Sequence, residues 1–315
     1  MKKALIIIDR LELKYYEFNK LVTNFWFNKI LLEMGISVDI CTIDGLSISK
    51  FQPFADCYET KWKNKDLKKS KETKQKNIND FDLVLFRPDP PVDIDYINAT
   101  LIFDFVDTDK VKVINSPKAI RNFNEKFHSN LFPKYVPENI VSANKKQIKD
   151  FVIKHKKAVI KPLNQCFGQG VTALFEGDIN LNSLIKTATN DGKTICLIQK
   201  YLEGATHGDK RVLTLGDEVL GYAVTKAPLD NDFKFSEHSD NYLRKAELTK
   251  TDIEIAKNVA QKLNSMGISL IGLDILDGKI LEINVTSPCY FLKEIKNIYN
   301  IDLSDKFKEF FKKYL

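Results

Sequence analysis

Two apolar segments in the C-terminal part of the chain, residues 269–276 and 279–283, are separated only by the dipeptide Asp277-Gly278. A connection this short predicts an antiparallel β-hairpin, because Asp-Gly readily adopts the left-handed backbone that a two-residue turn requires. The turn also fixes which residues face each other across the two strands. A fold that contains this segment must therefore contain a sheet.

Three side chains that carry oxygen atoms, Asp274, Glu282 and Asn284, fall on the predicted hairpin. The turn places Asp274 opposite the other two, which share one face because side chains alternate along a strand. Asp277 lies in the turn and is expected to point elsewhere. Magnesium prefers hard oxygen ligands, takes few from protein and completes its shell with water and phosphates. The pattern predicts a magnesium site, with a solvated surface patch as the alternative.

The N-terminal part of the chain predicts an open α/β lobe. Residues 4–8 form an apolar run typical of a buried parallel strand, followed by a helical stretch to about Met34 and a second strand at 36–41. A loop-rich stretch, residues 44–80, is expected before a third strand at 83–86. This order is a βαβ opening.

The peptide Arg-Pro-Asp-Pro-Pro at residues 87–91 follows the third predicted strand. Its three prolines cannot continue regular structure. Open α/β sheets bind ligands beside the carboxyl ends of their strands, so a turn with polar side chains at this place is a candidate ligand site.

Further short strands and one helix are expected along the remainder of the chain. The strands are predicted at residues 111–114, 159–162, 171–175, 196–199, 211–215 and 218–224. The helix has apolar residues repeating at three and four between 256 and 266 and ends at Gly267. Residues 226–247 are polar and weakly patterned, which is typical of a loop.

The positive charge of the chain is concentrated in one segment. The formal net charge is +6, and residues 61–76 alone contain eight lysines against Asp66 and Glu72, so the rest of the chain balances to zero. We expect a solvated loop or helix face here, with phosphate attraction or a nucleic-acid contact as the alternative. Because aromatic residues do not alternate with the basic ones, we expect no nucleic-acid partner.

Cysteine usage and hydropathy favour a cytoplasmic protein. The five cysteines are odd in number and widely spaced, which predicts neither a disulfide framework nor a zinc cluster. No apolar run reaches the roughly 18 residues that span a bilayer, so neither a membrane segment nor secretion is expected.

Eight short motifs then occur in the order found in the bacterial glutathione synthetases of the ATP-grasp superfamily, which the chain resembles over nearly its whole length. The motifs are Arg-Pro-Asp-Pro-Pro (87–91), Asn-Ser-Pro (115–117), Asn-Glu-Lys (124–126), Ile-Lys-Pro (160–162), Gln-Lys-Tyr-Leu (199–202), Gly-Asp-Lys-Arg-Val-Leu (208–213), Gly-Leu-Asp (272–274) and Glu-Ile-Asn-Val-Thr-Ser-Pro (282–288).

The resemblance implies an α/β ATP-grasp fold of three lobes with an N-terminal open parallel α/β domain. The expected domains are an N-terminal substrate domain (1–121), a central lid domain (122–201) and a C-terminal catalytic domain (202–315), with ATP between the last two. The family's habit also implies a homo-oligomer, either a tetramer or a dimer.

The resemblance also implies roles for single residues. The ATP-binding residues are Lys126 and Lys161 on the phosphates, Gln199, Lys200, Tyr201 and Leu202 around adenine, and Asp209 on the ribose. Asp274, Glu282 and Asn284 are implied to hold two Mg²⁺ ions, with Mn²⁺ as a possible substitute. Arg211 and Lys226 are the implied catalytic residues, and Arg87, Asp89, Ser287 and Pro288 the substrate-binding ones.

The reaction of the family passes the γ-phosphoryl group of ATP to the terminal carboxylate of γ-glutamylcysteine, and the amine of glycine then attacks the acyl phosphate. One departure concerns residues 226–241, which contain no glycine where the family has an arginine and a glycine-rich loop. A related ligase with another amine acceptor or γ-glutamyl peptide, and a non-catalytic ATP-binding regulator, are therefore the alternatives.

Overall fold

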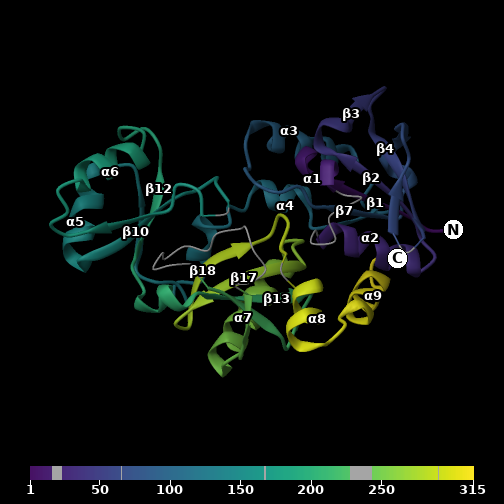
Figure 1. The fold of residues 1–315 in the computed structure, drawn as a ribbon. Coiled ribbons are helices and arrows are strands. Elements are labelled where there is room, and N and C mark those ends of the chain that lie inside the picture. The colour runs from purple at the N-terminus through teal and green to yellow at the C-terminus, as the bar shows by residue number, and fades with distance from the viewer. Residues whose placement is uncertain (16–22, 65, 167, 228–242, 290) are drawn as a thin grey trace.

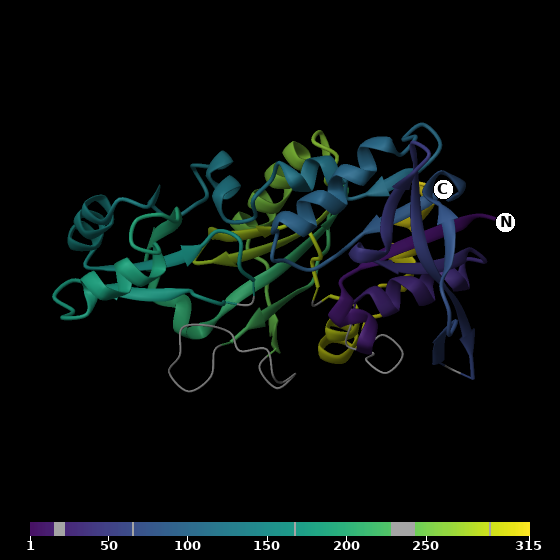
Figure 2. The ribbon, with the colours of Figure 1, turned by 90° about the horizontal axis from the view of Figure 1, so that it is seen from above.

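The fold is a three-lobed α/β arrangement built on three sheets (Figure 1). It is taken from a computed structural model that describes residues 1–15, 23–64, 66–166, 168–227, 243–289 and 291–315. Both chain termini lie at one end of the molecule and the central lobe lies at the other (Figures 1 and 2).

The N-terminal sheet has a parallel centre, as predicted. Its parallel strands, in the spatial order β2-β1-β7-β8, are β1 (Lys3–Ile8), β2 (Ser37–Thr42), β7 (Leu83–Phe86) and β8 (Lys112–Ile114). Residues 4–8 are completely buried because helices cover the sheet, which explains their uninterrupted apolar run. The helices of this lobe are α1 (Arg10–Tyr15), α2 (Thr23–Glu33), α3 (Ile94–Ile102) and α4 (Pro117–Arg121).

The prediction of a loop-rich stretch at residues 44–80 was wrong. The segment forms four antiparallel strands, β3 (Leu46–Ser49), β4 (Gln52–Lys63), β5 (Asp66–Lys69) and β6 (Lys74–Asn77). Most of the described lysines of the run accordingly lie on strands, and Lys71 lies in the connection between β5 and β6. The charges of the run hid the strands because exposed edge strands commonly carry lysine, and Lys76 pairs with Asp39 at 2.7 Å.

The central lobe is a four-stranded antiparallel sheet with a core of its own. The strand order is β11 (Thr172–Phe175), β10 (Lys157–Pro162), β12 (Cys196–Lys200) and β9 (Asn139–Ser142). Helices α5 (Lys145–His155) and α6 (Leu181–Ala188) pack against it through buried residues such as Ile148 and Phe151.

The C-terminal sheet contains the predicted hairpin. Its strands are β13 (Asp209–Leu215), β14 (Glu218–Val219), β15 (Ala223–Lys226), β16 (Leu243–Ala246), β17 (Leu270–Leu276) and β18 (Lys279–Asn284). Asp277 and Gly278 both have positive φ, at 50° and 67°, as the two-residue turn requires. The predicted helix is α7 (Lys250–Asn264), which starts with a capping box formed by Thr249 and Asp252.

Two strand predictions in this sheet need correction. The strand expected at residues 218–224 is divided into β14 and β15. Part of the expected loop at 226–247 is the strand β16, which pairs with β15; residues 228–242 lie outside the described part of the chain. Among the described residues, the structure contains no helix with the length and apolar character that a membrane span needs.

The C-terminal helices return to the N-terminal lobe. They are α8 (Lys293–Tyr299) and α9 (Ser304–Lys312), and α9 lies against α2 (Figure 1). The ring of Phe27 on α2 lies 5.1 Å from that of Phe307 and 5.4 Å from that of Phe311. The N- and C-terminal lobes thus share continuous hydrophobic cores, whereas the central lobe does not join them. The proposed domain boundaries after residues 121 and 201 stay a prediction.

Replacing Phe307, which is fully buried, with alanine tests the packing of α9 against α2. We expect Phe307→Ala to lower the free energy of unfolding of the N-terminal lobe by about 3–5 kcal/mol, since a cavity replaces a buried ring. The two tryptophans of the chain, Trp26 and Trp62, both belong to that lobe, so urea unfolding followed by tryptophan fluorescence measures it. Lys312→Ala, at an exposed position of the same helix, is the control; equal effects of the two substitutions would contradict the assignment.

Candidate active site

A cavity of about 210 Å³ is lined by residues from all three lobes. Every residue predicted for the site lines it except Arg87 and Pro288. The predicted residues in its wall are Asp89, Lys126, Lys161, Gln199, Lys200, Tyr201, Leu202, Asp209, Arg211, Lys226, Asp274, Glu282, Asn284 and Ser287. Residues up to 198 positions apart in sequence therefore meet here, as Asp89 and Ser287 do by a hydrogen bond.

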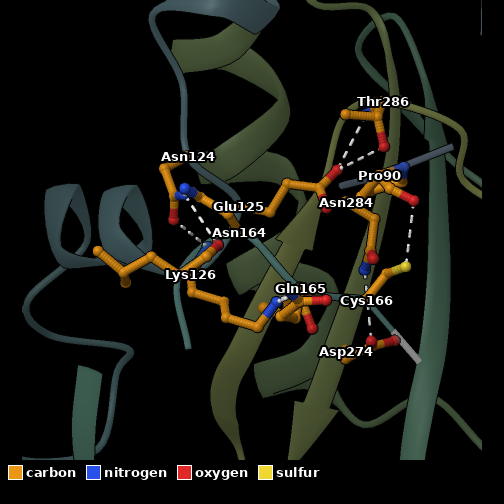
Figure 3. Close-up of polar contacts among 12 residues, drawn as sticks. Pro90, Asn124, Glu125, Lys126, Asn164, Gln165, Cys166, Asp274, Asn284 and Thr286 are labelled. Atoms are coloured by element: carbon orange, nitrogen blue, oxygen red, sulfur yellow. Dashed lines mark hydrogen bonds and ion pairs between the residues drawn. The ribbon is translucent and has the colours of Figure 1, made fainter. Parts of the chain in front are cut away.

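The hairpin supplies the acidic wall of the cavity. Asp274 on β17 pairs with Glu282 on β18, and Asn284 pairs with Gly272 two residues further along the strands. The amide nitrogen of Asn284 lies 3.3 Å from Asp274 Oδ2 (Figure 3). The carboxylate of Asp277 accepts a hydrogen bond from the backbone N–H of Gly204 at 3.1 Å.

Asp274 is held by two cations. Arg211 binds it through two nitrogens, with Nε 2.6 Å from Oδ1 and Nη2 3.1 Å from Oδ2, and Lys226 Nζ lies 2.9 Å from Oδ2. Burial acts to raise the pKa of Asp274, but the guanidinium and the ammonium outweigh it and hold that pKa far below its ordinary value. The carboxylate is therefore ionised.

Asp209 completes a neutral set of four charges. Lys226 Nζ lies 2.9 Å from Asp209 Oδ2 as well as from Asp274. Strand register produces both contacts, because Asp209 faces Lys226 across β13 and β15, and Arg211 faces Asp274 across β13 and β17. Two carboxylates and two cations are thus buried together without net charge.

The two predicted phosphate-binding lysines reach the cavity from different segments of the chain. Lys126 Nζ lies 2.8 Å from Glu282 Oε1 and donates to the backbone oxygen of Gln165 at 2.6 Å. Lys161 stands on β10 of the central lobe, and burial lowers the pKa of its ammonium to about 8. Both are placed to meet an anion that enters between the lobes.

Gln199 has a buried side-chain amide whose hydrogen-bonding capacity is unused by the described residues. It is 1% exposed and lies on β12 at the edge of the cavity. Neither its amide oxygen nor its amide nitrogen has a hydrogen-bond partner among the described residues. Buried polar groups are almost always hydrogen-bonded, so this side chain is suited to a ligand with its own donors and acceptors.

The oxygen atoms of Asp274, Glu282 and Asn284 fit a small, hard cation. Two carboxylates and an amide on facing strands form the donor set that magnesium accepts. Each carboxylate is already neutralised by a protein cation, Glu282 by Lys126 and Asp274 by Arg211 and Lys226. Binding of a metal together with phosphates would let these cations change partner from carboxylate to phosphate.

Arg87 and Pro288 lie just behind the cavity wall. Arg87 is 2% exposed, donating from Nε to Asn24 Oδ1 at 2.5 Å and from Nη2 to the oxygen of Pro288 at 2.8 Å. Burial raises the pKa of neighbouring Asp89 to about 7. The two segments predicted to bind substrate are therefore brought together, although Arg87 supports the wall from behind.

Several cavity residues were not predicted from the sequence. Gln165, Cys166 and Cys289 line the cavity, as does Glu125. A group of carboxylates lies at the part of the wall that Asp89 forms. One oxygen from each of Asp9, Glu12 and Asp89 lies within 4.8 Å of the other two. Asp9 could have been found, because it follows β1 just as the 87–91 peptide follows β7, and parallel neighbouring strands end at the same sheet edge.

Comparisons with known proteins agree with this geometry. The chain matches the family model of the prokaryotic glutathione synthetase N-terminal domain over residues 6–121 and that of its ATP-grasp domain over residues 125–300. The glutathione synthetase of Synechococcus elongatus is 36% identical over 235 residues, which are 75% of this chain and 72% of the relative. That of Vibrio cholerae is 34% identical over 229 residues, 73% of this chain and 72% of the relative.

Solved structures share the fold at low sequence identity. A D-cycloserine synthetase has a TM-score of 0.64 at 14% identity, covering 91% of this chain and 92% of its own. D-alanyl-alanine synthetase A from Vibrio cholerae has a TM-score of 0.61 at 12% identity, covering 99% and 98%. These likenesses establish the ATP-grasp fold.

The charge network predicts different costs for two substitutions. Asp274→Asn leaves Arg211 and Lys226 buried with only Asp209 opposite them, so we expect the free energy of unfolding to fall by about 3–5 kcal/mol. Glu282→Gln removes the carboxylate from Lys126, which is buried but still donates to the backbone oxygen of Gln165, and should cost less, about 1–3 kcal/mol. Urea unfolding of both variants measures the difference, and equal losses would contradict the network.

Proposed function

The chain belongs to the prokaryotic glutathione synthetase family, and from this we propose that it joins γ-glutamylcysteine to glycine at the expense of ATP, giving glutathione, ADP and phosphate. It is an ATP-dependent ligase of the ATP-grasp fold. The observation that carries the proposal is the cavity between the lobes, which gathers a hard-cation site, phosphate-binding lysines and the substrate segments.

ATP would enter between the central and C-terminal lobes. The unpartnered amide of Gln199 and the following residues Lys200, Tyr201 and Leu202 supply the pocket for the base. Asp209 is placed for the ribose, and Lys126 and Lys161 for the phosphates. Burial lowers the pKa of Lys161 to about 8, and an anion bound beside it would raise that pKa again and favour the charged ammonium.

ATP-grasp ligases use ATP with a divalent metal, and we propose Mg²⁺, held here by Asp274, Glu282 and Asn284, with Mn²⁺ as a substitute. When bound, the metal neutralises phosphate charge during phosphoryl transfer. Lys126, which contacts Glu282 at 2.8 Å, would then be available to the phosphates. The residues present need no rearrangement of the strands to offer their oxygens, since the register of the hairpin already sets them side by side.

Arg211 and Lys226 are proposed to stabilise the charge that develops on the acyl phosphate. Both are fixed before substrate arrives, so little reorganisation is needed at the moment of reaction. The segments joined by the hydrogen bond from Ser287 to Asp89 are proposed to bind the terminal carboxylate of γ-glutamylcysteine. The glycine amine would attack from the side of Lys226. A homo-oligomer is proposed by analogy with the family.

The acceptor can be identified by measuring phosphate release with ATP, Mg²⁺ and γ-glutamylcysteine across a panel of amino acids. We expect glycine to stimulate release most strongly. Strong stimulation by another amine with none by glycine would favour the related ligase, and ATP binding without turnover for any amine would favour a regulator. Omission of Mg²⁺, or its replacement with Mn²⁺, tests the metal in the same assay.

Lys226→Met should lower kcat about 10²–10³-fold, because one preorganised cation facing the developing charge is lost. Lys226→Arg retains the charge and should stay within about tenfold of the wild type. Steady-state kinetics with all three substrates saturating measures both. Lys210→Met is the matched control, since its ammonium pairs with Asp252 at 2.8 Å outside the cavity. Full activity of Lys226→Met would refute the assignment.

A further inference from the structure

Glu125 holds the turn that carries the substrate-binding residues. Its Oε1 accepts hydrogen bonds from the backbone N–H groups of Val285 at 2.7 Å and Thr286 at 3.0 Å, and from the hydroxyl of Thr286 at 3.0 Å (Figure 3). Ser287 and Pro288, which contact Asp89 and Arg87, come next in the chain. A single carboxylate oxygen therefore holds the first two residues of this turn, Val285 and Thr286.

The backbone of the same residue fixes the end of β18. The oxygen of Glu125 accepts from the N–H of Ile283 at 3.0 Å. Ile283 lies between Glu282 and Asn284, the two hairpin residues proposed to hold the metal. Glu125 thus contacts the metal-binding strand and the substrate-binding turn at once.

The preceding residue, Asn124, extends this junction to the central lobe. Its Nδ2 donates to the backbone oxygen of Leu163 at 2.9 Å and to Asn164 Oδ1 at 3.2 Å, while its Oδ1 accepts from the N–H of Lys126 at 3.1 Å (Figure 3). The next residue of that loop, Gln165, accepts from Lys126 Nζ.

These contacts matter because the central lobe has a separate hydrophobic core. Its position relative to the cavity depends on polar contacts of loops such as that of residues 163–166. Cys166 of this loop also donates through its thiol to the oxygen of Pro90 at 3.3 Å, so the loop reaches the N-terminal lobe.

We propose that Glu125 is a positioning residue that sets the peptide-binding turn at residues 285–288, with Asn124 tying the same junction to the central-lobe loop. The inference rests on the proposed function, in which this turn binds the γ-glutamyl peptide. Glu125 acts through Thr286 and Ser287 and takes no part in the chemical step.

The test measures equilibrium binding of γ-glutamylcysteine by calorimetry, in the presence of Mg²⁺ and a non-hydrolysable ATP analogue. Glu125→Ala removes all three acceptor contacts and should weaken peptide binding about tenfold or more, whereas the affinity for the analogue should change less than about threefold. Glu125→Gln retains an acceptor oxygen of the same reach and should recover peptide binding to within about threefold of the wild type. Glu309→Ala, at an exposed position on α9, is the control.

Equal weakening of peptide and nucleotide binding, or no rescue by glutamine, would overturn the proposal and leave a purely structural role. If Glu125→Ala does not fold, Thr286→Val replaces it: loss of the one hydroxyl should weaken peptide binding about threefold, and no change would refute the proposal.

This design separates the inference from the proposed function. Binding needs no turnover, so an enzyme that fails to form glutathione can still show the split between peptide and nucleotide. If the wild type binds a different γ-glutamyl peptide in place of γ-glutamylcysteine, the same comparison is made with that peptide. A wild type that binds no γ-glutamyl peptide at all would overturn both.

Discussion

The active site depends on a buried, neutral cluster of four charges: Asp209 and Arg211 on β13, Lys226 on β15 and Asp274 on β17. Removing such groups from water costs several kcal/mol each unless they are paired, and a misaligned strand would leave one of them alone. Because cross-strand register makes the pairs, a register shift of one residue would turn each side chain to the opposite face. The cluster therefore ties correct folding of the C-terminal sheet to assembly of the site.

Ion pairs within the protein explain how the cations and carboxylates of the proposed site can lie together before any ligand binds. Arg211, Lys226 and Lys126 have carboxylate partners at 2.6–2.9 Å that stand in for the phosphates and acyl phosphate of the proposed reaction. In the proposed reaction, substrate binding would exchange the partners of cations that are already in place. An arrangement of this kind saves reorganisation in the reacting complex, which is the main source of electrostatic catalysis.

Sequence reasoning succeeded where the controlling interactions are local. The Asp277-Gly278 turn dictates its hairpin within a few residues, and so the pairing of Asp274 with Glu282 could be predicted. The strands between residues 46 and 77 could not, because the small buried residues Ala55 and Cys57 alternate with the larger apolar side chains of Phe54 and Tyr58, and lysines make up half of β5 and β6. The packing of Phe307 on Phe27 joins segments 280 residues apart, and nothing local to either helix indicates it.

The site residues show the same division. The site residues that the motifs supplied line the cavity except Arg87 and Pro288, yet motif order could not show that Arg87 supports the wall from behind or that Glu125 contacts the 285–286 backbone. Both facts depend on contacts between lobes. Glu125 was overlooked although it stands beside Lys126, because a buried carboxylate with backbone partners leaves no spacing pattern in the sequence.

The cavity thiol of Cys289 bears on the chemistry as well. Arg211 Nη1 lies 3.9 Å from its sulfur, and a cation so close favours a thiolate. Burial is the larger effect and raises the pKa of this thiol to about 12, so it stays protonated. A protonated thiol is a poor nucleophile, and a route through a thioester on Cys289 is disfavoured. Arg211 is paired with Asp274 and not with a thiolate. These charges support the proposed activation of the carboxylate by phosphoryl transfer.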